Sequence, residues 1–201
     1  MLSPKTIKKF LGMQQCSKNG HKVKDLFQMI LNAPDLWQHA YLKIYANPGN
    51  MPAGTDGQTR DGYAEERAAN LCELLRDHQF VPTPVRRVSI PNANGKMRPL
   101  GIPNAHDKLV QEVWRMVLEA IYEPGFWDTS HGFRPHRSCH TALPKIRNTW
   151  TGTKWFIEFD IEGYFDNIDH QISPFAQSIS TILNFKQPLC AFPETSLKCA
   201  F

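Results

Sequence analysis

Residues 85–102 constrain the fold most, because they combine two strand-like segments with a turn that determines how the strands pair. The segments "VRRVSI" (85–90) and "MRPLGI" (97–102) flank "NANG" (92–95), whose Asn-Gly pair favours the tight turn of an antiparallel hairpin. Pro99 has no backbone N–H, so we expect the returning strand to be an edge strand or to leave the ladder early. The chain must therefore contain β-structure beside its helices.

Apolar residues recur at helical spacing in four other segments, which predicts helices over 22–30, 35–45, 62–78 and 104–121. The last helix has the strongest pattern, and Asn104 is predicted to cap it. Its expected buried stripe consists of Leu109, Val110, Val113, Val117, Leu118 and Ile121. Together with the hairpin, these segments predict an α+β fold whose N-terminal part is helical.

The segment "FIEFDIEGYFDNIDH" (156–170) crowds acidic residues around the end of a predicted buried strand, "KWFIEFD" (154–160). Its five acids are Glu158, Asp160, Glu162, Asp166 and Asp169. Clustered carboxylates repel one another and lose hydration when buried, so they need a cation, a basic partner or water. Strand alternation places Asp160 at the carboxyl end of the strand, where it suits Mg²⁺. The alternative is a solvated aspartate that caps the next turn.

The hairpin is strongly basic. Between Val85 and Arg98 the chain carries four cations and no acid: Arg86, Arg87, Lys96 and Arg98. Guanidinium groups match the geometry of phosphate oxygens, so such a hairpin can fold over a triphosphate or a nucleic-acid backbone. The alternative is an edge of a sheet that charge protects against aggregation.

A second basic stretch, "HGFRPHRSCHTAL" (131–143), contains three histidines and a cysteine. Their spacing fits none of the usual zinc-ligand pairs, and no second cluster completes a tetrahedral site. Arg134 and Arg137, beside Phe133, suit a nucleic-acid backbone with a packed aromatic side chain.

The composition favours a polyanionic partner and excludes a membrane span. The 201 residues have a net charge of +4, and six lysines but no acid precede Asp25. No apolar run approaches the ~20 residues that a membrane span needs. The five cysteines form no CxxC pair, which fits a reducing compartment, either the bacterial cytoplasm or an organelle.

These motifs occur in an order that resembles a known family. "PVRRVSIPNANGKMRPLGIPNAHDKL", "SHGFRPHRS" and "FIEFDIEGYFDNIDH" closely resemble the group II intron-encoded reverse transcriptases and maturases. "AGTDGQT" (53–59) looks like the family's block before the fingers, and the resemblance covers residues 25–170. It implies the fingers and the start of the palm of a right-handed reverse transcriptase, with RNA as intron and template, a DNA primer and deoxynucleoside triphosphates as partners.

The resemblance also implies roles for individual residues. Asp160 would hold catalytic Mg²⁺ with the backbone carbonyl of Ile161, and Phe165 would lie against the sugar of the incoming nucleotide. Arg86 and Arg98 match residues near the triphosphate. The family has a lysine where Asn92 stands here, and Lys96 would supply part of the triphosphate contact of that lysine. The expected nucleic-acid contacts are Arg87, Gly132, Phe133, Arg134, Pro135 and Arg137.

Besides Asn92, a second feature departs from the family's pattern. The tyrosine–x–aspartate–aspartate motif that supplies further metal ligands is absent from the sequence, so the Mg²⁺ site is expected to be incomplete and the chain inactive alone. The alternative function is a non-catalytic RNA-binding protein of splicing, or a decayed remnant. The expected division is a basic flexible arm (1–21), a helical extension (22–80), fingers and start of palm (81–170) and a divergent, poorly ordered tail (171–201).

Overall fold

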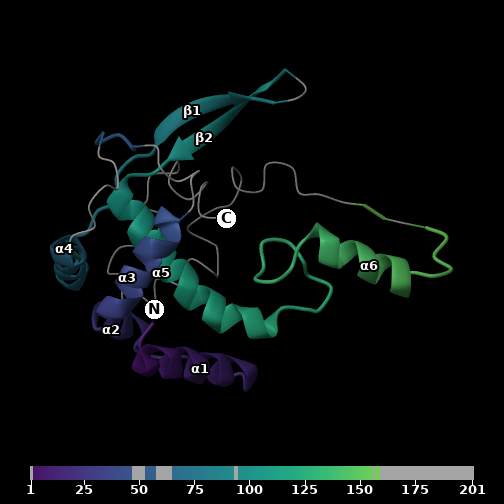
Figure 1. The fold of residues 1–201 in the computed structure, drawn as a ribbon, viewed down its shortest axis with the longest axis horizontal. Helices are drawn as coiled ribbons and strands as arrows, with labels where there is room; N and C mark the ends of the chain where they lie inside the picture. The colour runs from purple at the N-terminus through teal and green to yellow at the C-terminus, as the bar shows by residue number, and fades with distance from the viewer. Residues whose placement is uncertain (1, 47–52, 58–64, 93–94, 156, 159–201) are drawn as a thin grey trace.

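The computed structural model describes residues 2–46, 53–57, 65–92, 95–155 and 157–158. In chain order the described elements are α1 (Pro4–Lys18), α2 (Leu26–Leu31), α3 (Pro34–Tyr45), α4 (Glu65–Arg76), β1 (Arg86–Pro91), β2 (Met97–Ile102), α5 (Ala105–Tyr122), the 3-10 turn η2 (Glu123–Gly125) and α6 (Cys139–Thr149), as Figure 1 shows. Helices combined with one small antiparallel sheet confirm the predicted α+β class.

Helix α5 is the element around which the others pack. It contacts α3, α1 and η2, and α3 in turn contacts α2 and α4. Figure 1 shows α5 running from the hairpin at one end to α1 at the other. The predicted stripe is confirmed in part, since Leu109, Val110, Val113 and Val117 are buried, whereas Leu118 and Ile121 are only partly buried. The side chains that complete the core come from the other helices and include Met13, Leu26, Phe27, Ile30, Leu36, Trp37, Ala40, Ala68, Leu71 and Leu75.

The short helices before the hairpin begin and end where proline and backbone conformation require. Pro34 opens α3, because its ring suits the first turn of a helix and cannot continue the preceding one. The helix predicted over 22–30 is shorter than expected, since Asp25 has a left-handed backbone conformation (φ 58°) and α2 starts after it. Trp37 fixes the two helices together by donating its indole N–H to the Ile30 carbonyl over 3.0 Å.

Within the predicted basic arm, residues 4–18 form the helix α1. The Ser3 side chain caps this helix by accepting the Thr6 N–H, and Asp35 of α3 accepts bonds from the Ser3 N–H (2.9 Å) and the Thr6 hydroxyl (3.0 Å). Burial opposes ionisation of Asp35, but these hydrogen bonds outweigh it and lower the pKa of that carboxyl below its ordinary value. Met13 packs into the core. A cap and one apolar face therefore order a segment whose lysine content suggested flexibility.

The predicted hairpin is confirmed. Strands β1 and β2 pair antiparallel, with Arg86 opposite Ile102 and Pro91 opposite Met97. Pro99 lies opposite Ser89 within this ladder; since the described sheet has two strands, both are edges, where proline is tolerated.

The prediction of a buried strand over 154–160 is wrong for its described residues. Trp155 and Ile157 are 87% and 90% exposed, and residues 153–155 and 157–158 belong to no strand. A strand needs a neighbour to pair with its backbone, and the described sheet consists of the hairpin alone. The residues from Phe159 onward, including the predicted tail, lie outside the described part of the chain. None of the described helices is long and apolar enough to span a membrane.

Because Trp37 fills the centre of the core, we expect Trp37→Ala to lower the free energy of unfolding by about 3–5 kcal/mol. Urea unfolding followed by circular dichroism measures this loss. Trp155→Ala is the matched control, since its exposed side chain should change stability by less than about 0.5 kcal/mol. Equal effects of the two substitutions would contradict this description of the core.

Candidate nucleic-acid interface

The hairpin presents its cations on two faces. The register pairs Arg98 with Ile90, so Arg98 shares a face with Arg86, whereas Arg87 lies on the opposite face. These side chains and Lys96 are all exposed. The structure thus brings the four predicted hairpin residues into one basic element. Arg86 also donates its Nε–H to the Ala53 carbonyl over 2.9 Å, which ties the base of β1 to the preceding loop.

Asn104 connects that loop to α5. The residue stands at the N-cap position, but its side chain makes no capping bond to its own helix. Instead, Asn104 Oδ1 accepts the Thr55 N–H over 2.7 Å, and the Thr55 hydroxyl lies 3.1 Å from the same oxygen. A Cβ at Gly54 would lie 1.8 Å from Asn104 Oδ1 and 2.8 Å from its Cα, so only glycine permits this approach. The predicted capping role of this side chain is therefore corrected to a tertiary one.

Asp107, one turn into α5, connects the segment that leads into β1. Its Oδ2 accepts the Thr83 N–H over 3.3 Å and also the Thr83 hydroxyl. Asp107 is buried, and this desolvation raises the pKa of its carboxyl, although the bonds from Thr83 oppose the shift. The first turn of α5 thus holds both chain segments that flank the base of the hairpin.

Sequence reasoning did not identify this junction. One signal was available for Asp107, which precedes Val110 by three residues and so lies on the apolar side of α5, where an acid needs a buried partner. For Gly54 and Thr55 there was none, because 49 residues separate Thr55 from Asn104.

Arg134 holds the loop that follows α5. Its Nε and Nη2 groups donate to the Glu123 carboxylate at distances of 2.7–3.1 Å, and Nη1 donates to the carbonyls of Trp127 (2.9 Å) and Ser130 (2.8 Å). Its guanidinium carbon lies 5.1 Å from the centre of the Phe126 ring. The side chain is only 8% exposed. In this structure the guanidinium of Arg134 therefore donates its hydrogen bonds to acceptors within the protein.

Asp128 organises the other side of the loop. Lys145 of α6 and Arg137 both pair with its carboxylate, Arg137 over 2.9 Å. Their hydrogen bonds and charges, with Lys145 contributing most, lower the pKa of Asp128 to about 2. Since the carboxyl becomes protonated only near that value, it keeps its charge through neutral and mildly acidic pH.

The same loop displays aromatic side chains to solvent. Phe133 is fully exposed and has a left-handed backbone conformation (φ 54°), and Trp127 is 83% exposed. Gly132 and Pro135 stand on either side of the Phe133–Arg134 pair. A loop that is tied by ion pairs and exposes aromatic side chains to water is suited to contact a partner.

Comparison with known proteins agrees with these features. Residues 90–186 match the family model of the reverse transcriptase (RNA-dependent DNA polymerase). The group II intron-encoded protein LtrA of Lactococcus lactis is 47% identical over 164 residues, which cover 79% of this chain and 27% of LtrA. An uncharacterized 91 kDa protein in the cob intron of Schizosaccharomyces pombe is 45% identical over 147 residues, 73% of this chain and 18% of that protein.

The chain belongs to the group II intron reverse transcriptase/maturase family. It spans about a quarter of the length of LtrA and less of the yeast protein. The reverse transcriptase match extends past His170 to residue 186, and so overlaps the start of the segment predicted to be divergent, residues 171–201.

The predicted catalytic residue and metal ligand Asp160, the predicted metal ligand Ile161 and the predicted nucleotide contact Phe165 lie outside the described residues. Within the described part, no group of three or more histidine, cysteine or acidic side chains could hold a metal ion. The predicted contacts of the hairpin and of the loop around Phe133 lie within the described residues.

Because only glycine fits against Asn104, we expect Gly54→Ala to displace the loop from α5 and release the base of the hairpin. The substitution should lower the free energy of unfolding by at least about 1 kcal/mol and speed hydrogen exchange in β1. Gly125→Ala is the matched control, because a Cβ there meets nothing within 4 Å. Unchanged exchange in β1 of Gly54→Ala would contradict the junction.

Proposed function

We propose that this chain is the fingers and the start of the palm of a group II intron reverse transcriptase, and that its described part binds RNA. The observation that carries this proposal is the acid-free hairpin, whose Arg87 and Arg98 project from opposite faces of a sheet anchored to α5. Phosphate contacts supply most of the affinity of such basic surfaces and do not depend on base sequence. Intron RNA and an RNA template are the proposed partners.

The structure refines the proposed role of the second loop. Since Arg134 uses its donors within the protein, we assign it a positioning role, in which it holds the loop that exposes Phe133. Phe133 can then stack on an unpaired base, which needs only a ring face and tolerates any sequence. Arg137 would contact phosphate only by giving up its pair with Asp128.

The proposed polymerase chemistry concerns residues beyond the described part. In a complete enzyme, Mg²⁺ bound by Asp160 and the carbonyl of Ile161 would stabilise the negative charge that develops during nucleotidyl transfer. Arg86, Lys96 and Arg98 would hold the triphosphate, with a DNA primer as acceptor. We propose that this chain alone does not polymerise, because its sequence lacks the further aspartates that two ions require.

A second candidate function is a non-catalytic RNA-binding role in splicing. A relative named nuclear intron maturase 1 of Arabidopsis thaliana favours it. That relative is 34% identical over 99 residues, 46% of this chain and 14% of the maturase. Primer extension separates the two functions, since Mg²⁺-dependent incorporation of deoxynucleotides would exclude the non-catalytic one.

If the hairpin binds phosphates, the logarithm of the association constant for single-stranded RNA should fall linearly with the logarithm of the salt concentration. Arg87→Ala and Arg98→Ala should each reduce the magnitude of that slope by about 0.7, because each removes about one phosphate contact. Fluorescence anisotropy between 50 and 300 mM salt (roughly the range where such slopes are resolved) measures it.

The matched control is Arg76→Ala, which removes the same charge at the end of α4, away from the hairpin. Its slope should equal that of the unmodified chain. An affinity that does not depend on salt would refute the proposed electrostatic footprint.

A further inference from the structure

Strand β1 carries a hydroxyl group in the middle of its basic surface. Ser89 is exposed, and Arg86 and Arg87 stand three and two positions before it. The apolar residue Ile90, which follows it, is 45% exposed. Among all serines and threonines of the sequence, Ser89 alone has an arginine three positions before it. The proposed RNA contacts of the hairpin do not use this hydroxyl group.

The backbone of Ser89 points to an open edge of the sheet. The Asn92 N–H donates to the Lys96 carbonyl over 2.8 Å, and from there hydrogen-bonded pairs alternate with non-hydrogen-bonded pairs along the antiparallel ladder. Ser89 therefore faces Pro99 in a non-hydrogen-bonded pair, which suits a residue without an N–H. Its own N–H and C=O are directed away from β2, and no described strand covers that edge of β1. Another protein can therefore bind this extended segment by β-strand pairing.

A kinase that reads arginines before its acceptor serine requires these features. Such an enzyme holds the acceptor segment in an extended conformation and places its hydroxyl next to the transferred phosphoryl group. Carboxylates of the kinase can form forked ion pairs with Arg86 and Arg87, which extend to opposite sides of the strand. The stretch from Val85 to Arg98 contains no acid that would repel those carboxylates.

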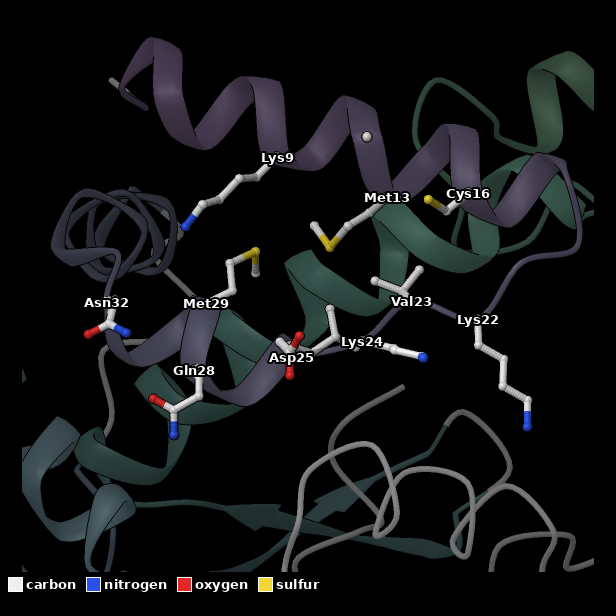
Figure 2. Close-up of a pocket in the computed structure, with 12 residues that line it drawn as sticks. Lys9, Met13, Cys16, Lys22, Val23, Lys24, Asp25, Gln28, Met29 and Asn32 are labelled. Atoms are coloured by element: carbon white, nitrogen blue, oxygen red, sulfur yellow. The ribbon is translucent and has the colours of Figure 1, made fainter.

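A second basic surface of the described chain offers no comparable acceptor. Lys9, Lys22 and Lys24 surround a groove between α1 and the segment that leads into α2, as Figure 2 shows. None of the side chains that line this groove carries a hydroxyl group. Ser17 of α1 donates its hydroxyl to the Ile121 carbonyl. Positive charge alone therefore does not make an acceptor site, whereas the hairpin combines charge with an exposed hydroxyl.

We propose that Ser89 is phosphorylated by an arginine-directed serine kinase, and that the phosphate switches off one face of the hairpin. The kinase transfers the γ-phosphoryl group of ATP. The bond from the γ-phosphorus to the oxygen that bridges to the β-phosphate breaks, and a bond to Ser89 Oγ forms. The hydroxyl proton is released, and ADP leaves with the bridging oxygen. The modification rests on the geometry of the hairpin, whereas its effect on RNA rests on the proposed RNA-binding function.

The phosphate would act on Arg87 in particular. Ser89 and Arg87 are two residues apart, so they lie on the same face of β1, about 7 Å apart along the strand. Gly101, opposite Arg87, has no side chain that would separate the two groups. A phosphoserine carries about two negative charges at neutral pH and accepts forked hydrogen bonds from a guanidinium. Arg98 lies on the opposite face, so phosphorylation should withdraw Arg87 from RNA and leave Arg98 available.

Phosphorylation of the full chain in vitro tests the site. The chain is incubated with ATP, Mg²⁺ and the catalytic subunit of cyclic-AMP-dependent protein kinase, an arginine-directed enzyme, and peptide mass spectrometry locates the phosphate. We expect Ser89 to be the main acceptor, and Ser89→Ala to lose most of the incorporated phosphate. Arg87→Ala should lower kcat/KM of the kinase at least about tenfold, because it removes one forked ion pair. Arg98→Ala, the matched control, removes the same charge outside the positions before Ser89 and should change kcat/KM less than about twofold.

RNA binding of the modified chain tests the switch. Phosphoserine placed at position 89 by codon suppression should weaken binding of single-stranded RNA about tenfold at about 100 mM salt, because it neutralises about two positive charges of the hairpin. In the phosphorylated chain, Arg87→Ala should cause no further loss of affinity, whereas Arg98→Ala should still weaken binding. Fluorescence anisotropy measures both effects. The Ser89→Ala chain should bind RNA as tightly as the unmodified chain.

The failures of the two proposals are distinguishable. If the kinase leaves Ser89 of the folded chain unmodified, the proposed site is overturned, and modification of an isolated peptide of residues 84–92 would then locate the cause in the folded sheet. If phosphoserine at position 89 leaves RNA affinity unchanged, or weakens the Arg87→Ala chain as strongly as the unmodified one, the switch is overturned and the hairpin function stands. If the unphosphorylated chain binds no RNA, the proposed function and the switch fail together, whereas modification of Ser89 by the kinase still supports the site.

Discussion

Burial of one face of α5 is the constraint on which the rest of the structure depends. Val113 and Val117 are completely buried in the middle of this helix, and each such side chain contributes about 1.5–3 kcal/mol when it leaves water. The helices α1 and α3 cover that face, and α2 and α4 pack on α3. Without α5, the short helices before the hairpin would have no common surface to bury, because isolated helices of this length are marginal in water.

The same helix supports, through its two ends, the hairpin and the loop that carry the described candidate contacts. Its first turn uses Asn104 and Asp107 to hold the loops at the base of the hairpin, and its last turn meets α1 and continues into η2. Glu123, in η2, then fixes Arg134 and with it the loop that exposes Phe133. The flexible cationic side chains are therefore attached to a folded support. This attachment reduces the conformational entropy that the protein loses when it binds a ligand.

Sequence reasoning succeeded where the physical signal is local. Two strand-like segments around an Asn-Gly turn predicted the hairpin. Apolar residues three and four positions apart predicted α3 and α5. Sequence reasoning did not find the bonds to distant partners: the Asn104 side chain, predicted to cap α5, bonds to Thr55, and the guanidinium of Arg134 pairs with Glu123. The lysines of residues 1–21 concealed α1, because its order depends on one cap and a few apolar side chains that pack on distant helices. The family resemblance identified motifs but not these tertiary bonds.

Hydrogen exchange of the full chain, with and without single-stranded RNA, tests the central claim most directly. The amides of α5 around Val113 should exchange most slowly among the described residues, since opening them requires opening the whole core. RNA should add protection in the hairpin, from Arg86 to Ile102, and leave α4 unchanged. Fast exchange in α5, or RNA protection that omits the hairpin, would contradict a nucleic-acid-binding module built on this helix.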